Sequence, residues 1–444
     1  MNLEEKLRQL KRTAQKSSED RDLAGQLEYL RMMEQPAKKL PAQRAPHQIE
    51  EYVEGRVQQH AFGEFFVAEQ SLPFGRPYGT VRIGDVAAAD LAALNLFLEG
   101  LSLPEASRLV YLDTETTGLA GGAGTCAFLI GIGMVEGAQF VVRQFFLREY
   151  TEEKAALAAL AEALDGRDGL VTFNGKTFDV PLLETRYTLA RLRAPFSRLL
   201  HLDLLHPARR LWKLRLENCQ LTNLERHVLG IAREGDVPGS EIPGIYFDYL
   251  RTGDARGLQP VFFHNALDII SMAALAVEMA RTLRAAQGEE SAASRELRTQ
   301  AGLDLFSLSR IFERAGATDV SLATCRRALA AGLPEPVEPR ALWHLAAQHK
   351  RRREFEAAVE IWRDLSRRPG GYAVEAYREL AIHFEHRRRD AQSALEFTKA
   401  ALALLGADAH ARSNGLVRDE HLKHFTHRKT RLERKLSRSP VEAA

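Results

Sequence analysis

The sequence predicts an α/β domain, in which helices flank a mixed β-sheet, followed by an all-α domain of helical repeats. Two observations support this fold class. Three neighbouring strand patterns in the first half of the chain are followed by alternating helical and strand patterns, an order typical of a mixed sheet covered by helices. Beyond about residue 290 the pattern is helical throughout, and similar groups of residues recur about every 34 positions.

Length, composition and charge limit the class of protein. The chain has 444 residues, of which 45% are hydrophobic and 27% charged, as in globular proteins of about three domains. The formal net charge is only +2, so any attraction to nucleic acid must come from local basic patches. The three cysteines form no Cys-x-x-Cys pair, which excludes a disulfide scaffold or a cysteine-rich zinc module and fits a reducing compartment.

We expect a soluble, cytoplasmic protein that does not enter a membrane. The first six residues include three charged side chains, unlike a secretory signal. The longest nearly unbroken apolar run, at residues 126–135, has ten positions and two glycines, whereas a helix that spans a bilayer needs about 20 residues.

The elements of the α/β domain follow from local patterns. Apolar, β-prone runs predict strands at residues 65–67, 79–83, 108–113, 126–135, 139–147 and 170–173. Helical spacing of apolar residues predicts helices at residues 87–98, 152–164, 180–193 and 221–229.

The helical repeats rest on residues that match at a fixed offset. Trp343 aligns with Tyr377 at an offset of 34, and Ala358 aligns with Ala394 at an offset of 36. This period resembles that of tetratricopeptide repeats, whose stacked helical hairpins present a surface to a protein partner. A protein partner is therefore expected here. An ordinary helical bundle in an alanine-rich chain is the alternative.

Both ends of the chain are polar. Near the start, scattered basic residues are consistent with an arm that binds nucleic acid or with a solvated tail, and three prolines in residues 34–47 indicate a linker. Residues 410–438 carry nine lysines and arginines, three acids and four histidines. That segment could follow the phosphates of nucleic acid or form a helix solvated on one face.

Candidate catalytic residues begin with Asp113 and Glu115, at the end of an apolar strand. Because strand side chains alternate, residues at i and i+2 lie on the same face. Two adjacent carboxylates repel by about 1 kcal/mol in water and by more in a cleft. A divalent cation between them would offset this repulsion; alternatively, the two acids cap the turn that follows.

Two further acidic positions lie later in the chain. Asp179 opens a predicted helix with Pro181 in its first turn, which alone indicates an ordinary N-cap. His264 and Asp268 are four positions apart on a helical pattern, so they share a face. Alone, such a pair is typical of a surface hydrogen bond.

The order of these groups resembles that of the DEDD exonuclease superfamily. Asp-x-Glu at a strand end is followed by Asn-x-x-x-Phe-Asp and then by His-x-x-x-Asp. The chain resembles this ribonuclease-H-like group, and its YprB-type branch in particular, over about residues 60–285. The glycine-rich residues 118–125 and the segment at residues 236–243 carry the closer match.

The resemblance implies a ribonuclease-H-like fold and a 3′-to-5′ exonuclease that uses two Mg²⁺ or Mn²⁺ ions on a DNA or RNA 3′ end. It implies four metal ligands: Asp113, Glu115, Asp179 and Asp268. His264 would be the general base, although its spacing to Asp268 is that of the tyrosine version of the superfamily. The implied nucleic-acid contacts are Thr116, Thr117, Gly118, Asn174 and Lys176.

With this resemblance the chain divides into four parts. These are a polar segment and linker at residues 1–59, a ribonuclease-H-like exonuclease domain at 60–285, tetratricopeptide-like repeats at 300–410 and a basic tail at 411–444.

Some neighbouring residues are open to two interpretations. The glycine loop matches a dinucleotide fingerprint loosely, but a strand pattern follows it and no Gly-Lys-Ser/Thr is present, so we expect it to link two antiparallel strands. Asp203 either supports the site or simply ends a helix or strand. Phe173 and Phe178 are expected to be buried rather than stacked on bases.

Two other functions remain open. One is a scaffold whose nuclease-like domain binds nucleic acid without cutting it, although the presence of all four acids argues against a decayed site. The other is an endonuclease, since this fold hosts both kinds of nuclease.

Overall fold

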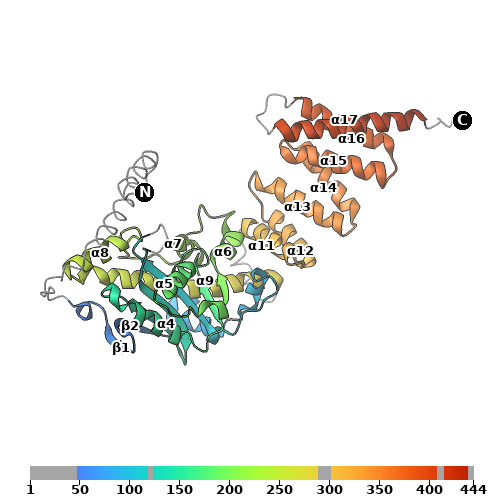
Figure 1. Cartoon of the computed structure of the whole chain (residues 1–444). Coiled ribbons are helices and arrows are strands. Elements are labelled where there is room, and N and C mark those ends of the chain that lie inside the picture. Colours follow the sequence, from blue (N-terminus) through green and yellow to red (C-terminus); the bar gives the residue numbers. More distant parts are fainter. Residues whose placement is uncertain (1–47, 119–123, 289–301, 408–414, 439–444) are drawn as a thin grey trace, which may run out of the picture. The chain divides into compact units, whose positions relative to one another are not determined.

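The computed structural model describes residues 48–118, 124–288, 302–407 and 415–438. The chain forms two compact units, Met1–Arg284 and Ala285–Ala444 (Figure 1). The predicted linker at residues 34–47 and most of the glycine loop lie outside the described residues.

A mixed sheet forms the centre of the first unit, as the sequence predicts. Within the described residues it has seven strands in the order β1-β2-β7-β6-β5-β8-β9. The pairs from β1 to β5 are antiparallel, and the pairs β5–β8 and β8–β9 are parallel. The strands are β1 Gly55–His60, β2 Gly63–Pro73, β5 Leu109–Thr116, β6 Ala127–Glu136, β7 Gln139–Phe146, β8 Gly169–Thr172 and β9 Leu200–Asp203. The glycine loop joins β5 to β6, an antiparallel pair, as expected.

Helices cover both faces of this sheet. They are α4 Glu153–Ala163, α5 Asp179–Leu189, α6 Leu205–Trp212, α7 Leu221–Leu224, α8 Ile242–Thr252 and α9 Gln259–Gln287. Val110 and Leu112 of β5 belong to the core that includes α4 and α5. Phe128 of β6 belongs to a second core, with Tyr246 of α8 and Phe262 of α9. Since strand side chains alternate, Asp113 and Glu115 lie on the face opposite Leu112.

The region before β5 differs from the prediction. Residues 79–83 contribute only β4 Val81–Arg82, which pairs with β3 Pro77–Tyr78 in a separate small sheet. The helix predicted at residues 87–98 is instead the end of α3 Ile83–Ala88 followed by a 3₁₀ segment, Leu91–Phe97. The physical reason is Asp90, whose carboxylate accepts a hydrogen bond from the Ala92 amide at 3.0 Å and so starts a new helical segment.

Helix α9 packs closely against β6 because two glycines leave room for it. A Cβ at Gly131 would lie 2.1 Å from Asn265 Oδ1, and one at Gly133 would lie 2.3 Å from Ile269 Cγ2. Residues 256–287 are long and apolar enough to cross a membrane by length and composition, yet 72% of their most apolar window is buried inside the structure. This helix is therefore a core element of the first unit.

The second unit consists of helices that pack in sequence order (Figure 1). They are α11 Gly302–Arg314, α12 Thr318–Ala330, α13 Val337–Arg351, α14 Phe355–Arg367, α15 Gly371–His386, α16 Ala391–Ala407 and α17 Gly415–Arg438. Ala358 and Ala394, which align in the sequence repeat, are both fully buried. Helix α17 forms within the segment predicted as a basic tail and packs on α16. The tetratricopeptide assignment and its protein partner stay predictions.

Candidate active site

Four carboxylates of the predicted site influence one another electrostatically. Asp113 and Glu115 lie near the end of β5, Asp179 is the first residue of α5, and Asp268 lies on α9. Burial raises the pKa of Asp113 well above its usual value, and the charges of Asp268, Glu115 and Asp179 raise it further. Burial, followed by Asp268 and Asp179, raises the pKa of Glu115 to about 8. These shifts show that the fold brings the four acids together at a cost that a bound cation would offset.

Two amide side chains, Asn265 and Gln144, hold the carboxylate of Asp113 in position. Asn265 on α9 is fully buried, and its Nδ2 donates to Asp113 Oδ2 at 2.9 Å. Gln144 on β7 donates from Nε2 to Asn265 Oδ1 at 2.9 Å and to the carbonyl of Phe262 at 2.8 Å. Because Gln144 fixes the orientation of the Asn265 amide, the carboxylate of Asp113 has a defined position.

Arg233 places a buried positive charge beside the acids. Its side chain is only 6% exposed and donates to Asp268, to Asp236 at 3.0 Å and to both oxygens of Glu225 at 2.5 and 2.7 Å. Burial alone would lower the pKa of Arg233, but the hydrogen bonds and charges of Glu225 and Asp268 raise it overall. Arg233 therefore stays charged and neutralises part of the site.

His264 lies between two carboxylates. Its Nδ1 is 2.8 Å from Asp236 Oδ1, and its Nε2 is 3.7 Å from Asp268 Oδ2. An ionised carboxylate can only accept a hydrogen bond, so Nδ1 carries the hydrogen on the Asp236 side. In the neutral ring, Nε2 then has a free lone pair on the side of Asp268.

Asp179 is held by the neighbouring strand and loop. Thr114 donates from Oγ1 to Asp179 Oδ1 at 2.5 Å. Burial raises the pKa of Asp179 to about 6, although the hydrogen bond from Thr114 opposes the rise. Asp203, at the end of β9, accepts from the backbone amides of Asn174 at 2.8 Å and Lys176 at 3.1 Å. The carboxylate of Asp203 thus shapes the loop that leads to Asp179, which is a supporting role.

The predicted nucleic-acid contacts lie on two loops beside these acids. Thr116, the last residue of β5, donates from Oγ1 to the carbonyl of Gly118, and the Thr117 hydroxyl accepts from the amide of Cys126, both at 3.0 Å. In the loop before α5, Asn174 has a left-handed backbone with φ of 69°, and the side chain of Lys176 is exposed. Among the described residues, no hydrogen bond joins these five residues to Asp113, Glu115, Asp179 or Asp268, although Asn174 and Lys176 donate to Asp203.

Phe178 differs from expectation. It is 54% exposed rather than buried, because it precedes α5 and its neighbour Asp179 takes the buried position. Phe263, next to His264, is likewise 46% exposed. Phe173 is half-buried. Exposed rings beside a charged site are suited to stacking on nucleic-acid bases.

The donor set fits a hard divalent cation in chemistry, since it consists of carboxylate oxygens. Among the described residues, however, no group of three histidine, cysteine, aspartate or glutamate side chains is arranged as a metal-ion site. The ion pair between Arg233 and Asp268 explains part of this difference, because it directs one of the four acids towards a guanidinium. Asp113, Glu115, Asp179 and Asp268 would have to adjust in order to share an ion.

Sequence reasoning missed the supporting residues Arg233, Gln144, Asn265 and Glu225. Asp236 lies within the segment at residues 236–243 that carries the family resemblance, but the resemblance implies no role for it. Asn265 follows His264 in the sequence, but on a helix its side chain lies about 100° round the axis from that of His264, so the face shared by His264 and Asp268 did not indicate it. Arg233 and Gln144 carry no local signal, because only the folded chain brings them to the acids.

The chain is similar to known proteins over its first unit and beyond. Residues 110–280 match the RNase H superfamily. Over 299 residues the chain is 32% identical to the uncharacterized protein YprB of Bacillus subtilis (strain 168), covering 67% of this chain and 70% of YprB. It is also similar to the family B DNA polymerase of the hyperthermophilic archaeon Pyrobaculum calidifontis, with a TM-score of 0.33 and 12% identity. That likeness covers 56% of this chain and 33% of the polymerase.

The mixed sheet and its flanking helices define a ribonuclease-H-like domain. Residues 110–280 form a domain of the RNase H superfamily, and the chain belongs to the family of YprB. This membership supports a hydrolase that acts on nucleic acid.

Proposed function

We propose that the ribonuclease-H-like domain is a metal-dependent 3′-to-5′ exonuclease. The observation that carries the proposal is that Asp113, Glu115, Asp179 and Asp268 lie close enough for their charges to act on one another. Burial, followed by the charges of Asp268 and Asp179, raises the pKa of Glu115 to about 8. Buried acids that repel one another are costly for a fold, and they are typical of functional sites. We propose that these four carboxylates hold two Mg²⁺ or Mn²⁺ ions. Such ions would activate a water molecule and stabilise the leaving oxygen of a phosphodiester.

His264 is suited to accept the proton of the attacking water. Asp236 orients the ring through Nδ1 at 2.8 Å, which leaves Nε2 as the acceptor. In the reaction, the water oxygen bonds to phosphorus, the water proton moves to Nε2, and the bond from phosphorus to the 3′ oxygen breaks. The products are a nucleoside 5′-phosphate and a strand shortened by one residue. His264 would act as the general base of this step.

The loops beside the acids would hold the 3′ end of the strand. The backbone and hydroxyls of Thr116, Thr117 and Gly118 offer hydrogen-bond partners for the terminal sugar. Asn174 and Lys176 would contact phosphates, and the exposed rings of Phe178 and Phe263 would stack on bases.

One observation favours a different function, binding of nucleic acid without cleavage. Arg233 pairs with Asp268 and so supplies a positive charge that a catalytic site would take from a metal ion. In that case Asp268 would be held permanently by the guanidinium, and the site would bind a strand but would not hydrolyse it.

A cleavage assay on 5′-labelled single-stranded DNA and RNA tests the proposal. It compares Mg²⁺, Mn²⁺ and EDTA, with Asp113→Asn as the site variant. The matched control is Asp165→Asn, since the side chain of Asp165 is 72% exposed and its ion pair with Arg198 lies at the surface. We expect a ladder that shortens from the 3′ end in the wild type and the control, and no cleavage by Asp113→Asn or in EDTA.

Substrates with a blocked 3′ end separate the alternatives. An exonuclease stalls on them, whereas internal products would identify an endonuclease on the same metal site. Binding of the strands without any product, with duplex substrates included, would replace the exonuclease by the binding function.

A further inference from the structure

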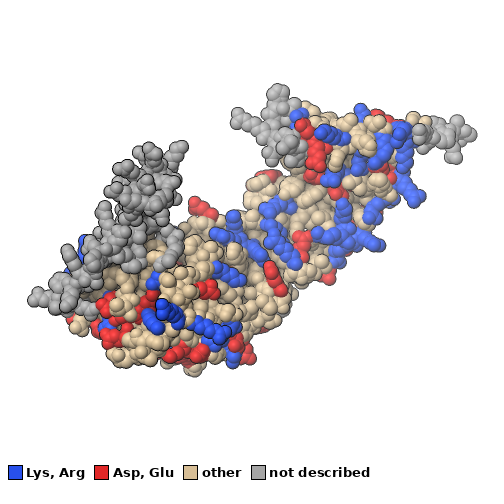
Figure 2. Space-filling view, viewed as in Figure 1, with Lys and Arg blue, Asp and Glu red and all other residues tan. Residues whose placement is uncertain are grey.

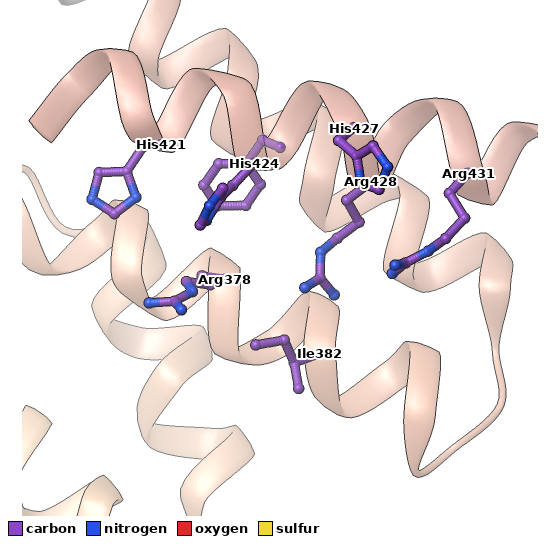
Figure 3. Close-up of a pocket in the computed structure, with 8 residues that line it drawn as sticks. Arg378, Ile382, His421, His424, His427, Arg428 and Arg431 are labelled. Atoms are coloured by element: carbon purple, nitrogen blue, oxygen red, sulfur yellow. The ribbon is translucent and has the colours of Figure 1, made fainter. Parts of the chain in front are cut away.

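A pocket in the second unit has a lining rich in basic side chains. It lies between α15 and α17 and has a volume of about 220 Å³ (Figure 3). Its polar lining consists of Arg378, His421, His424, His427, Arg428 and Arg431. Figure 3 shows Arg428 and Arg431 extending from α17 towards α15, on which Arg378 lies. Among the residues that the structure describes, no carboxylate lines this pocket, so its surface offers hydrogen-bond donors in high density.

Acidic residues outside the lining hold the arginines in place. Glu385 is buried and accepts from Arg428 at 2.8 Å and from Arg431 at 2.5 and 2.7 Å. Glu375 lies 3.6 Å from Arg378 and 3.2 Å from His421. A third carboxylate, Glu379, also acts on Arg428 and accepts from Lys350 at 2.6 Å. With Lys350 and the three arginines counted against Glu375, Glu379 and Glu385, one positive charge is left in excess before any histidine is counted.

Two features show that this positive charge is not fully satisfied. Burial lowers the pKa of Arg428, and the nearby charges of Arg431 and Arg378 lower it further, although Glu385 opposes the change. Nε of Arg431 is buried and has no hydrogen-bond acceptor among the described residues. A buried donor without an acceptor is unfavourable, and an anion beside Arg431 would supply the acceptor.

We propose that this pocket binds a phosphate group of a nucleic-acid strand. The guanidinium group matches phosphate oxygens in geometry and charge, and the imidazole rings add further donors. At about 220 Å³ the pocket is smaller than the roughly 300–1,000 Å³ of small-molecule sites, so it suits a single phosphate rather than a whole nucleotide. Ile382 and Phe425 are its apolar lining residues, too little apolar surface to anchor a protein segment.

The surrounding surface is consistent with a strand rather than a free phosphate. Lys423 and Lys435 on the same helix are exposed, and Figure 2 shows lysines and arginines spread over the helices of this unit. A nucleic-acid backbone repeats its negative charge along its length, so neighbouring basic residues can each neutralise a phosphate. The choice of nucleic acid as the source of the phosphate rests on the proposed function; the phosphate chemistry of the pocket does not.

Fluorescence anisotropy tests this proposal. It measures how tightly the full-length chain binds fluorescein-labelled DNA and RNA oligonucleotides in EDTA at several salt concentrations. Arg378→Gln and His424→Gln each alter an exposed lining residue on a different helix, so at least one variant should fold as the wild type does. The control is Arg367→Gln, an exposed arginine at the end of α14 outside the lining.

We expect Arg378→Gln to weaken binding roughly fivefold to tenfold at 0.1 M salt and to lower the salt dependence by about one phosphate contact. His424→Gln should weaken binding less, and Arg367→Gln should leave it unchanged. Equal losses of oligonucleotide affinity in all three variants, or no loss in any of them, would overturn the proposal that the pocket binds phosphate. The same assay with labelled poly-glutamate tests the other occupant. If Arg378→Gln lost poly-glutamate binding but kept oligonucleotide binding, the proposal would be contradicted and the pocket would be assigned to an acidic protein segment.

The outcomes for the two sites are separable. If no strand is cleaved but the pocket variants lose affinity, the exonuclease fails and the phosphate pocket stands. If strands are cleaved from the 3′ end and the pocket variants bind as well as the control, the phosphate-binding proposal is contradicted and the exonuclease proposal stands.

Discussion

Arg233 donates a hydrogen bond to Asp268, one of the four acids of the candidate active site, from a position 35 residues earlier in the chain. The same guanidinium holds Glu225, which is 1% exposed. A permanent positive charge therefore occupies the acidic site of the folded chain. It reduces the repulsion between the carboxylates, and it occupies Oδ1 of Asp268, which leaves Oδ2 as the oxygen open to a divalent ion.

The first prediction concerns the stability that Arg233 provides. Arg233→Gln leaves the buried carboxylate of Glu225 without its partner, and breaking a buried pair on one side costs about 3–5 kcal/mol. The double variant Glu225→Gln with Arg233→Gln should regain part of this loss, because it removes the unpaired charge. Urea unfolding of both variants measures the difference.

Arg251→Gln is the matched control for this prediction. Its pair with Asp248 is 71% and 69% exposed, so its loss should change stability by less than about 1 kcal/mol. Equal effects of Arg233→Gln and Arg251→Gln would show that the buried pair contributes little.

The second prediction is the pH dependence of the metal-free chain. Burial, with the charges of Asp268, Asp179 and Asp236, raises the pKa of Glu115 from 4.5 to about 8. Between these values the folded chain keeps a proton that the unfolded chain has lost, so unfolding releases a proton and stability falls as pH rises. In EDTA we expect the melting temperature to fall by roughly 5 °C or more from about pH 5 to pH 8.

Two comparisons isolate the cause. Glu115→Gln should flatten the pH dependence, and Glu162→Gln, whose side chain is 67% exposed, should not. Addition of Mn²⁺ at pH 8 should raise the melting temperature of the wild type more than that of Glu115→Gln. A wild-type melting temperature that rises with pH in EDTA would contradict the prediction.

The third prediction concerns the amide that holds Asp113. Asn265→Ala removes the donor to Asp113 Oδ2 and the acceptor of Gln144. Loss of such a supporting partner lowers metal affinity or activity by about 10–100-fold. Cleavage measured over a range of Mn²⁺ concentrations should show a higher Mn²⁺ requirement for this variant.

Asn223→Ala serves as its control, because the side chain of Asn223, in α7, donates to the carbonyl of Asn218 at an exposed position. An unchanged Mn²⁺ requirement in Asn265→Ala would mean that the position of Asp113 is set by the backbone of β5 alone.

The sequence predicted those parts of the site that lie in regular patterns. Asp113 and Glu115 end an apolar strand, and His264 and Asp268 are one helical turn apart, so local spacing sufficed to place each pair. The mixed sheet followed from the same reasoning, since β5, β6 and β7 are long and β-prone.

The rest depends on contacts between distant parts of the chain. Strand β9 has four residues and acquires its place only by pairing with β8, so Asp203 could not be assigned its role at the Asn174 loop. Arg233 lies in a segment without helix or strand pattern, and only the fold turns it towards Asp268. Helix α3 ends early because the Asp90 side chain competes for the backbone, a local effect that a helical pattern does not report.

The last prediction tests the close contact between β6 and α9. A Cβ at Gly131 would lie 2.1 Å from Asn265 Oδ1 and 2.4 Å from Ile269 Cδ1, so Gly131→Ala must displace these two side chains of α9, and with Asn265 the amide that holds Asp113. Overpacking of this kind costs typically 1–3 kcal/mol, and the shift should also reduce cleavage. Gly244→Ala, in helix α8 with open space around its Cβ, should instead stabilise the chain by up to about 1 kcal/mol. If Gly131→Ala left both stability and cleavage unchanged, α9 would tolerate displacement, and its amide and carboxylate could not be fixed in place by the sheet.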